Sequence, residues 1–185
     1  IINNNIDFIC SLINSCIENS HMPDCLKNST IFIIHKSGDK SNISKYSPIS
    51  LMNWLAKIFD IILYRKITQH FENNNVIDYS QYGFKKNMST KHVLFHIMVK
   101  IQDNLLHKKH TAMIIYDLVK AFDCTDHSIM LLKMMKVGFG QSDIKFFYSY
   151  LGNRTGVTKI GDCNSPPCKI MSGIPQGSII GQLLF

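Results

Sequence analysis

The chain contains 185 residues, 45% of them hydrophobic, and its 20 Lys and Arg against 13 Asp and Glu give a formal net charge of +7. This length and composition argue against a fully disordered chain and predict one domain, or two small lobes, with a buried core. The basic balance favours a polyanionic partner such as nucleic acid, although charge alone does not identify one.

Six scattered cysteines form no closely spaced pairs and have no matching pair of histidines, so their spacing does not fit a zinc site. They are Cys10, Cys16, Cys25, Cys124, Cys163 and Cys168. We expect free thiols in a reducing, intracellular compartment. The opening residues, "IINNNIDFIC", show no basic leader, long apolar core or initiating methionine. We therefore expect no secretory signal or membrane span, and we interpret the chain as a piece of a longer protein.

The first third of the chain predicts helix, strand and helix. Apolar residues at helical spacing predict a helix over residues 6–17, which Pro23 ends. "STIFIIHKSGDKSN" predicts a short buried strand that runs into a basic, turn-rich loop with Lys36. Ser50 is expected to cap a long amphipathic helix that ends near "ENNN". The apolar face expected for this helix consists of Leu51, Trp54, Leu55, Ile58, Ile61 and Ile62.

The middle of the chain predicts a loop, a helix and a strand. The loop "IDYSQYGFKKNMST" carries Lys85, and Ser89 or Thr90 is expected to cap the helix that follows, over residues 90–105. "TAMIIY", residues 111–116, predicts a buried strand.

The last third predicts two more helices and a hairpin. Asp126 is expected to cap a helix with Ile129, Leu132 and Met135 on its apolar face, stopped by Gly138. A short helix over "SDIKFFYSYL", a hairpin around "IGDC" and a turn at "SGIPQGS" follow. The mixture of helices and strands, with adjacent strands expected to pair antiparallel, predicts an α+β fold.

Asp117 directly follows the predicted strand "TAMIIY". A carboxylate fixed at a strand end suits Mg²⁺, which prefers hard oxygen ligands, and Phe122 would lie near whatever the metal holds. The alternative is that Asp117 caps a turn and Phe122 belongs to the core. We interpret Asp123, Asp126 and His127 as an exit turn and helix start rather than as further metal ligands.

Two further features are compatible with an anionic ligand. In "GIPQGS", Pro175 fixes the entry angle, Gly177 permits close backbone approach, and Gln176 offers a donor and an acceptor; a helix starting there would direct free amides at an anion. Such a turn alone is common. The loops around Lys36 and Lys85 could bind a triphosphate or a nucleic-acid backbone, or simply form solvated faces. Three nearby tyrosines could stack on bases or be buried: Tyr46, Tyr79 and Tyr82.

Taken in order, six segments make the chain resemble the reverse transcriptase domain of non-LTR retrotransposons of the jockey-like or LINE-like kind. These segments are "MPDCLKNSTIFIIHKSGDKSN", "YSPISLMNWLAKIFDIIL", "SQYGFKKNMST", "YDLVKAFDCTDHSIMLLKM", "YLGNRT" and "SGIPQGSIIGQLLF". The resemblance implies a right-hand polymerase fold with fingers and connecting helices in residues 1–110 and part of the palm, with an incomplete antiparallel sheet, in residues 111–185.

The same resemblance implies roles for matching positions. Asp117 would be the catalytic metal ligand, with the Leu118 carbonyl beside it, and Phe122 would screen the sugar of the incoming nucleotide. Gln176 and Gly177 would line the nucleotide and template pocket. Two lysines would face phosphates from the fingers, namely Lys36 and Lys85.

The implied reaction extends a DNA primer with deoxynucleoside triphosphates on an RNA template, assisted by two Mg²⁺ ions. The intact element protein would act in the nucleus. The family's second metal-binding segment, with two adjacent aspartates, belongs after "GQLLF", so the second metal site is expected to be incomplete. Ser47, Asn87 and Gln182 replace the arginine, glycine and proline usual in the family. We therefore expect an incomplete and inactive copy, with a non-catalytic nucleic-acid-binding remnant as the alternative.

Overall fold

The structure, a computed structural model, describes residues 5–185. Expectations that rest on the four residues before them lie outside this part of the chain. The chain divides into two compact units: the first contains the chain up to Thr68 and from Lys120 to Phe185, and the second is Gln69–Val119.

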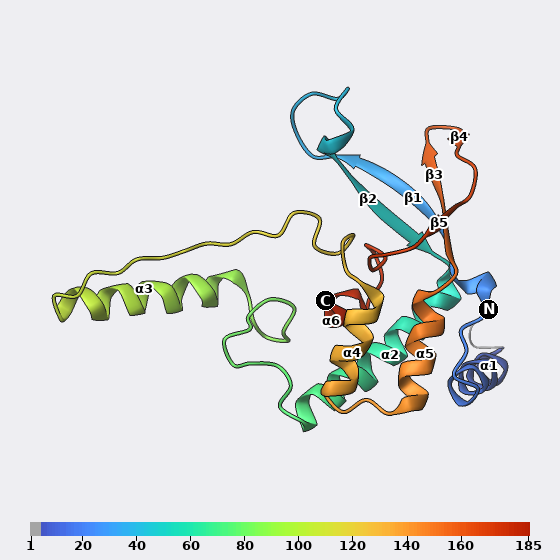
Figure 1. Cartoon of the computed structure of the whole chain (residues 1–185), viewed down its shortest axis with the longest axis horizontal. Coiled ribbons are helices and arrows are strands. Elements are labelled where there is room, and N and C mark those ends of the chain that lie inside the picture. Colours follow the sequence, from blue (N-terminus) through green and yellow to red (C-terminus); the bar gives the residue numbers. More distant parts are fainter. Residues whose placement is uncertain (1–4) are drawn as a thin grey trace. The chain divides into compact units, whose positions relative to one another are not determined.

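The first unit combines helices with a mixed sheet (Figure 1). Its helices are α1 (Ile6–Glu18), the start of α2 (Trp54–Asn73), α4 (His127–Lys136), α5 (Gln141–Leu151) and α6 (Gly181–Leu184), with short 3₁₀ turns at Asp24–Leu26 and Ile43–Lys45. Its strands are β1 (Asn28–His35), β2 (Tyr46–Met52), β3 (Arg154–Ile160), β4 (Cys163–Asn164) and β5 (Cys168–Ile170).

The sheet has the strand order β2-β1-β3-β4, and β5 also pairs with β3. Strands β1 and β2 form an antiparallel hairpin in which Ile31 lies opposite Ser50. The expectation that adjacent strands pair antiparallel is wrong for β1 and β3, which run parallel with Asn28 opposite Thr155. This pairing is possible because a long crossover, rather than a tight turn, connects the two strands.

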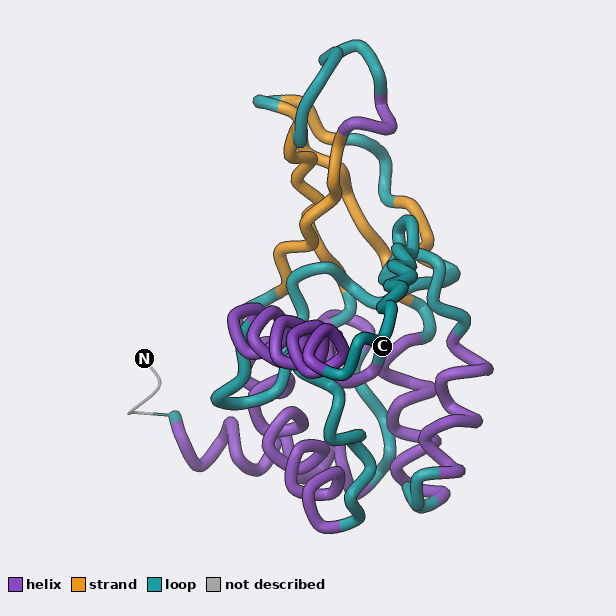
Figure 2. The backbone as a smooth tube through the Cα atoms, turned by 90° about the vertical axis from the view of Figure 1, so that its left-hand side faces the viewer, coloured by secondary structure: helices purple, strands orange, loops and turns teal. Residues whose placement is uncertain are grey.

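The core of the first unit lies among the helices, which gather at one end of the sheet (Figures 1 and 2). Burying a large apolar side chain stabilises the fold by about 1.5–3 kcal/mol, so these residues provide much of its stability. The buried apolar side chains of the four longer helices are Ile9, Ile13 and Cys16 in α1, Ala56, Phe59, Leu63 and Ile67 in α2, Met130 and Met134 in α4, and Phe146, Phe147, Tyr150 and Leu151 in α5.

Asp60 is a charged group inside this core, on α2, and is fully buried. The Tyr150 hydroxyl donates to Asp60 Oδ1 at 2.9 Å, and the Ile179 backbone N–H donates to Asp60 Oδ2 at 2.9 Å. Burial raises the pKa of Asp60 above its ordinary value, against the lowering effect of these hydrogen bonds and of Arg154. Burial, followed by the neighbouring Asp60, also raises the pKa of Tyr150, which therefore remains a hydrogen-bond donor.

The predicted helix boundaries are largely confirmed, but the expected cap of α2 is wrong. Ser50 lies within β2, buried, because pairing with β1 continues through Met52. The helix therefore begins after Asn53, whose side-chain oxygen accepts from the Leu55 N–H at 2.8 Å. Ser89 does precede α3 (Thr90–Leu106), and Asp126 caps α4 by accepting from two backbone N–H groups.

The predicted buried faces of α2 and α4 are also wrong. On α2, Trp54 and Ile61 are exposed, and the buried stripe instead contains Asp60 between apolar residues. On α4, all three predicted residues are exposed, and Met130 and Met134 are buried. Both helices carry two apolar stripes at helical spacing, so periodicity alone cannot identify the buried one.

The second unit contains α3 and the segment that follows it. None of the described residues of α3 is buried. The predicted buried strand "TAMIIY" is wrong: residues 111–118 are extended without pairing, and Ile115 and Tyr116 are 79% and 85% exposed. A strand requires a neighbour for its backbone groups, and the described part of the chain supplies none here.

We expect the backbone amides of residues 112–118 to exchange with deuterium within seconds, because no ladder of hydrogen bonds protects them. Amides of β1, which pairs on both sides, serve as the internal control. Hydrogen exchange followed by mass spectrometry of the whole chain measures both. Protection of residues 112–118 equal to that of β1 would contradict the extended, unpaired conformation.

The raised pKa of Asp60 predicts how stability depends on pH. A carboxyl group with a folded-state pKa above its unfolded value contributes stability that is present below about pH 3.9 and is lost as the pH rises through the folded-state pKa. Asp60→Asn keeps the shape and does not titrate. Urea titrations should therefore show that wild type loses stability relative to Asp60→Asn as the pH rises above about 4. A pH-independent difference between the two proteins would contradict the raised pKa.

Candidate functional site

The loop from Phe122 to Asp126 and the turn from Gly173 to Ser178 lie against each other in the first unit. The Ile174 N–H donates to the Phe122 carbonyl at 2.8 Å, and the Gly173 N–H donates to the Thr125 carbonyl at 2.9 Å. The ring nitrogen Nε2 of His127 lies 2.7 Å from the Gly173 carbonyl. These hydrogen bonds to backbone carbonyls hold the two segments side by side, although some fifty residues separate them in the sequence.

Gln176 joins the two segments through its side chain. Its Nε2 donates to Asp123 Oδ1 at 2.6 Å. This bond orients the side-chain amide of Gln176, so its other polar atom, Oε1, is held as an oriented acceptor. Phe122 is half-buried in the same loop, and its ring centroid lies 5.1 Å from that of Phe185. We call Phe122, Asp123, Gly173, Gln176 and Gly177 the loop–turn site.

The turn is also attached to the sheet. The Ser50 N–H on β2 donates to the Gln176 carbonyl at 2.7 Å. Gly177 has φ +122°, and a Cβ added there would lie 2.6 Å from the Ser50 carbonyl oxygen. Only glycine permits this conformation and this approach together. Two residues later, Asp60 holds the Ile179 N–H, so the turn is fixed on both sides of Gly177.

The turn predicted at "GIPQGS" is confirmed, and no helix starts in it. The residues after Pro175 form a turn, and the nearest helix is the four-residue α6, which begins at Gly181. The backbone N–H groups of Ser178 and Ile179 donate within the protein, to the Pro175 carbonyl and to Asp60. The turn therefore presents a side chain, Gln176, rather than a set of free amides.

The structure brings together three of the predicted site residues: Phe122, Gln176 and Gly177. Lys36 belongs to the same unit, but it lies at the opposite end of the β1–β2 hairpin from Ser50, where its N–H donates to the Lys45 carbonyl at 2.8 Å. Asp117, Leu118 and Lys85 belong to the second unit. Asp117 is exposed on the extended segment.

Lys85 lies half-buried in the loop before α3, near Asp78. The pKa of Asp78 is lowered, first by hydrogen bonds from Ser80 and then by Lys85. Of the three tyrosines, Tyr46 donates to the Lys40 carbonyl at 2.8 Å and Tyr82 lies 2.9 Å from a His96 ring nitrogen. Tyr79 is 84% exposed and thus the one accessible for stacking.

The metal-binding capacity of the described residues is limited. They contain no group of three or more His, Cys, Asp or Glu that could hold a metal ion. The Asp117 carboxylate and the Leu118 carbonyl are oxygen donors of the kind that Mg²⁺ prefers, but two oxygens alone do not build its octahedral site. Asp126 acts as a helix cap, as interpreted from the sequence. In the same part of the chain, every helix is too short or too polar to span a lipid bilayer.

Sequence reasoning missed Asp60, Gly173 and Asp123 as parts of the site. A carboxylate at an otherwise apolar position of a helix was the available signal for Asp60. Gly173 has φ +81°, and a Cβ there would lie 2.7 Å from the Asp123 carbonyl oxygen. No local pattern distinguishes this glycine, because the constraint comes from a distant segment.

Gly173→Ala should force the loop and the turn apart and lower the free energy of unfolding. Gly161→Ala is the matched control, because Gly161 also has a positive φ, +57°, but has open space around its Cβ position. We expect Gly173→Ala to destabilise the chain by about 1–3 kcal/mol more than the control does, which is the usual penalty of overpacking. Urea titration of both variants measures the difference. Equal losses would show that contact between the two segments is not tight.

Known proteins with similar sequences identify the family of this chain. A family profile described as "Reverse transcriptase (RNA-dependent DNA polymerase)" matches residues 34–185. The "Probable RNA-directed DNA polymerase from transposon BS" of Drosophila melanogaster is 25% identical over 96% of this chain and 20% of its own length. The "RNA-directed DNA polymerase from mobile element jockey" of the same species is 25% identical over 97% of this chain and 20% of its own length.

A third relative carries a different description. The "Retrovirus-related Pol polyprotein from type-1 retrotransposable element R1" of Bradysia coprophila is 24% identical over 97% of this chain and 17% of its own length. The chain thus spans about a fifth of the length of the curated relatives it matches. These comparisons confirm the resemblance seen in the sequence. The chain belongs to the reverse transcriptase (RNA-dependent DNA polymerase) family, and it is similar to the jockey-like enzymes of non-LTR retrotransposons.

Proposed function

We propose that the chain contributes fingers, residues 1–110, and part of a palm, residues 111–185, to a right-hand polymerase that copies RNA into DNA. The observation that supports this most directly is the loop–turn site, where Phe122 and Gln176 meet although they are far apart in the sequence. Membership of the reverse transcriptase family and the names of the relatives support the reaction class.

In this proposal the loop–turn site receives the incoming deoxynucleoside triphosphate. The Phe122 ring provides a rigid, half-buried surface against the sugar, and the fixed amide of Gln176 provides one oriented acceptor. Gly177 allows a base or a template strand to approach the backbone closely. A rigid surface of this kind discriminates by shape, because a substrate with an additional oxygen would have to displace the ring.

Asp117, with the Leu118 carbonyl, would hold Mg²⁺, which in this chemistry neutralises charge on the triphosphate. Asp117 is exposed, so its carboxylate is accessible to an ion. The lysines at positions 36 and 85 would contact phosphates of the RNA template, the DNA primer or the triphosphate as point charges. The net charge of +7 supports binding of nucleic acid by the chain in this proposal.

Asp117→Ala tests the catalytic part of this proposal. The protein to use is a chimera in which the chain is continued at its C-terminal end by the corresponding segment of the jockey relative. We expect primer extension on an RNA template to fall by about 10³-fold or more in Asp117→Ala, because metal stabilisation of such a transition state is worth several kcal/mol. Asp162→Ala, at an exposed aspartate of the β3–β4 turn, is the charge-matched control and should retain activity.

The unextended chain is measured in parallel, for salt-dependent binding of the primed template and for extension. Extension that survives Asp117→Ala would overturn the role of Asp117. If every protein binds the primed template but none lengthens the primer, the chimera included, the non-catalytic nucleic-acid-binding remnant is favoured. The net charge of +7 supports that alternative.

A further inference from the structure

A basic pocket lies in the first unit, and Phe122, Asp123 and Gln176 do not line it. One of its lining residues, His127, contacts the Gly173 carbonyl of the loop–turn site. Its volume is about 630 Å³, large enough for a nucleotide unit. It is formed by the segment before β1, by α4 and α5, by the connection from α5 to β3, and by β5. Its lining includes His21, Asp24, Lys27, Lys145, Arg154 and Lys169.

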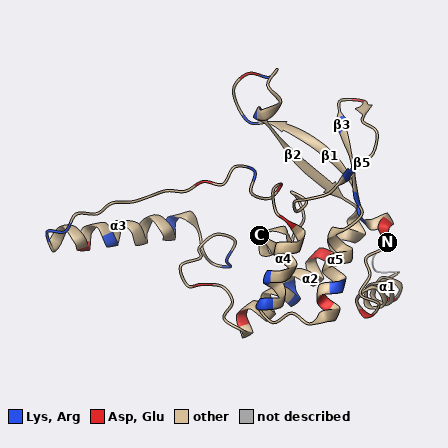
Figure 3. Cartoon of the chain, viewed as in Figure 1, with Lys and Arg blue, Asp and Glu red and all other residues tan. Residues whose placement is uncertain are grey.

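The charge of this pocket is strongly unbalanced. Four of its lining residues are Lys or Arg, and Asp24 is its one acidic residue. Lys27 Nζ lies 2.9 Å from Asp24 Oδ1, and this hydrogen bond and the charge of Lys27 lower the pKa of Asp24. The ion pair leaves the other three basic residues of the pocket without an acidic counterpart in its lining. Lys145 and Lys169 are exposed and form no ion pair in the described part of the chain. Figure 3 shows that basic positions occur on α4 and α5, so other lysines are available as controls.

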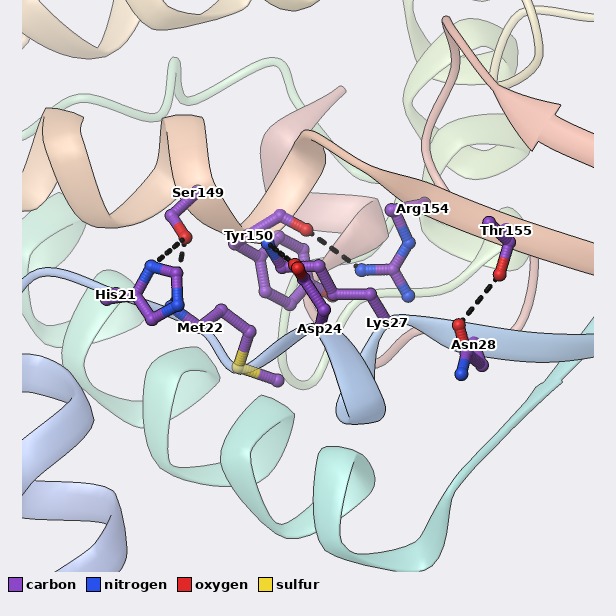
Figure 4. Close-up of polar contacts among 9 residues, drawn as sticks. All are labelled: His21, Met22, Asp24, Lys27, Asn28, Ser149, Tyr150, Arg154 and Thr155. Carbon is purple, nitrogen blue, oxygen red and sulfur yellow. Dashed lines mark hydrogen bonds and ion pairs between the residues drawn. The ribbon is translucent and has the colours of Figure 1, made fainter.

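Arg154 differs from the other basic residues that have no acidic partner in the pocket, because it is only 1% exposed. Its Nη1 donates to the Tyr150 carbonyl at 2.9 Å, and its guanidinium carbon lies 5.1 Å from the centre of the Tyr150 ring (Figure 4). Its Nε and Nη2 are buried without a hydrogen-bond partner among the described residues. A buried donor left unsatisfied costs about 1–3 kcal/mol, so a ligand that reached these two nitrogens would relieve that cost.

The two unsatisfied nitrogens share one edge of the guanidinium. Their N–H groups are parallel, and this fork matches two oxygens of a phosphate or carboxylate. Polar groups that could add hydrogen bonds are present as well: the Ser149 hydroxyl lies 3.2 Å from the His21 ring nitrogen Nδ1 (Figure 4). Two flexible lysines and a rigid fork around a pocket of this size suit a ligand that carries more than one negative charge.

We propose that this pocket binds a phosphate group of a single nucleic-acid strand, with Arg154 as the fork and Lys145 and Lys169 as mobile charges. The choice of nucleic acid as the source of the phosphate rests on the proposed function; the preference for phosphate rests on the pocket itself. The side chains of Phe122, Asp123 and Gln176 do not line the pocket, so in this proposal it holds the strand rather than the incoming nucleotide.

The test compares two double variants of equal charge. Lys145→Ala/Lys169→Ala removes the mobile charges, and Lys133→Ala/Lys136→Ala removes two exposed lysines of α4 that do not line the pocket. Binding of a fluorescent single-stranded RNA is measured by anisotropy over a range of salt concentrations. The pocket variant should bind more weakly, and its slope of log affinity against log salt should be shallower by about 0.7, as expected for one lost phosphate contact on a single strand. Equal behaviour of the two variants would overturn the proposal.

Inorganic phosphate distinguishes the source of the phosphate. Inorganic phosphate should raise the melting temperature of the wild-type chain. Arg154→Lys retains the charge but not the fork, so it should reduce that rise. If Arg154→Lys does not fold, the double variant Lys145→Ala/Lys169→Ala is used in its place. Stabilisation by inorganic phosphate combined with RNA binding that is unchanged in the pocket variant would assign the site to free phosphate and overturn a nucleic-acid role. Because no primer or triphosphate is present, the result is independent of whether Asp117 is catalytic.

Discussion

The buried carboxylate of Asp60 is the interaction on which the geometry of the first unit depends. It lies on α2, and its two oxygens hold a side chain of α5 and the backbone just after the Gln176 turn. A carboxylate is expensive to bury, so it is stable here only because both oxygens are satisfied and Tyr150 remains protonated. The helical core and the loop–turn site are therefore not independent. A change that moves Asp60 in the core would also remove the hydrogen-bond acceptor of the Ile179 N–H beside the turn.

Backbone contacts, more than side chains, determine the shape of the loop–turn site. Gly173 and Gly177 each permit the backbone to approach another segment at distances that a Cβ would prevent. The side chains of Phe122 and Gln176 then project from a scaffold that is already fixed. Such a scaffold is suited to a task in which the protein mainly positions its substrate, as in phosphoryl transfer. Asn87, where the family usually has glycine, adopts φ +63°, so this substitution retains the left-handed backbone that glycine would take.

The sequence allowed accurate prediction of features with local causes. Ser89 and Asp126 were recognised as helix starts, and the turn at "IGDC" was recognised as a hairpin, because short-range chemistry determines them. Features that depend on distant partners were not predictable: the buried face of α2 is set by its contacts with α5, and β1 pairs with β3 across most of the chain. "TAMIIY" has the composition of a strand, yet strand formation needs a partner that composition cannot supply. For the candidate site, the resemblance identified Phe122 and Gln176, whereas Asp60 and Gly173 emerged from the fold.

The parallel pairing of β1 with β3 has a consequence for the way this protein is made. Asn28 and Thr155 are 127 positions apart, and closing a loop of that length costs about 4 kcal/mol in chain entropy. At about 5–20 residues per second, a ribosome needs roughly ten seconds to synthesise the intervening chain. During that interval the β1–β2 hairpin can form, but the other edge of β1, with its run of isoleucines and phenylalanine, remains open. The nascent chain therefore passes through a period in which that edge of β1 has no strand to pair with, until β3 emerges.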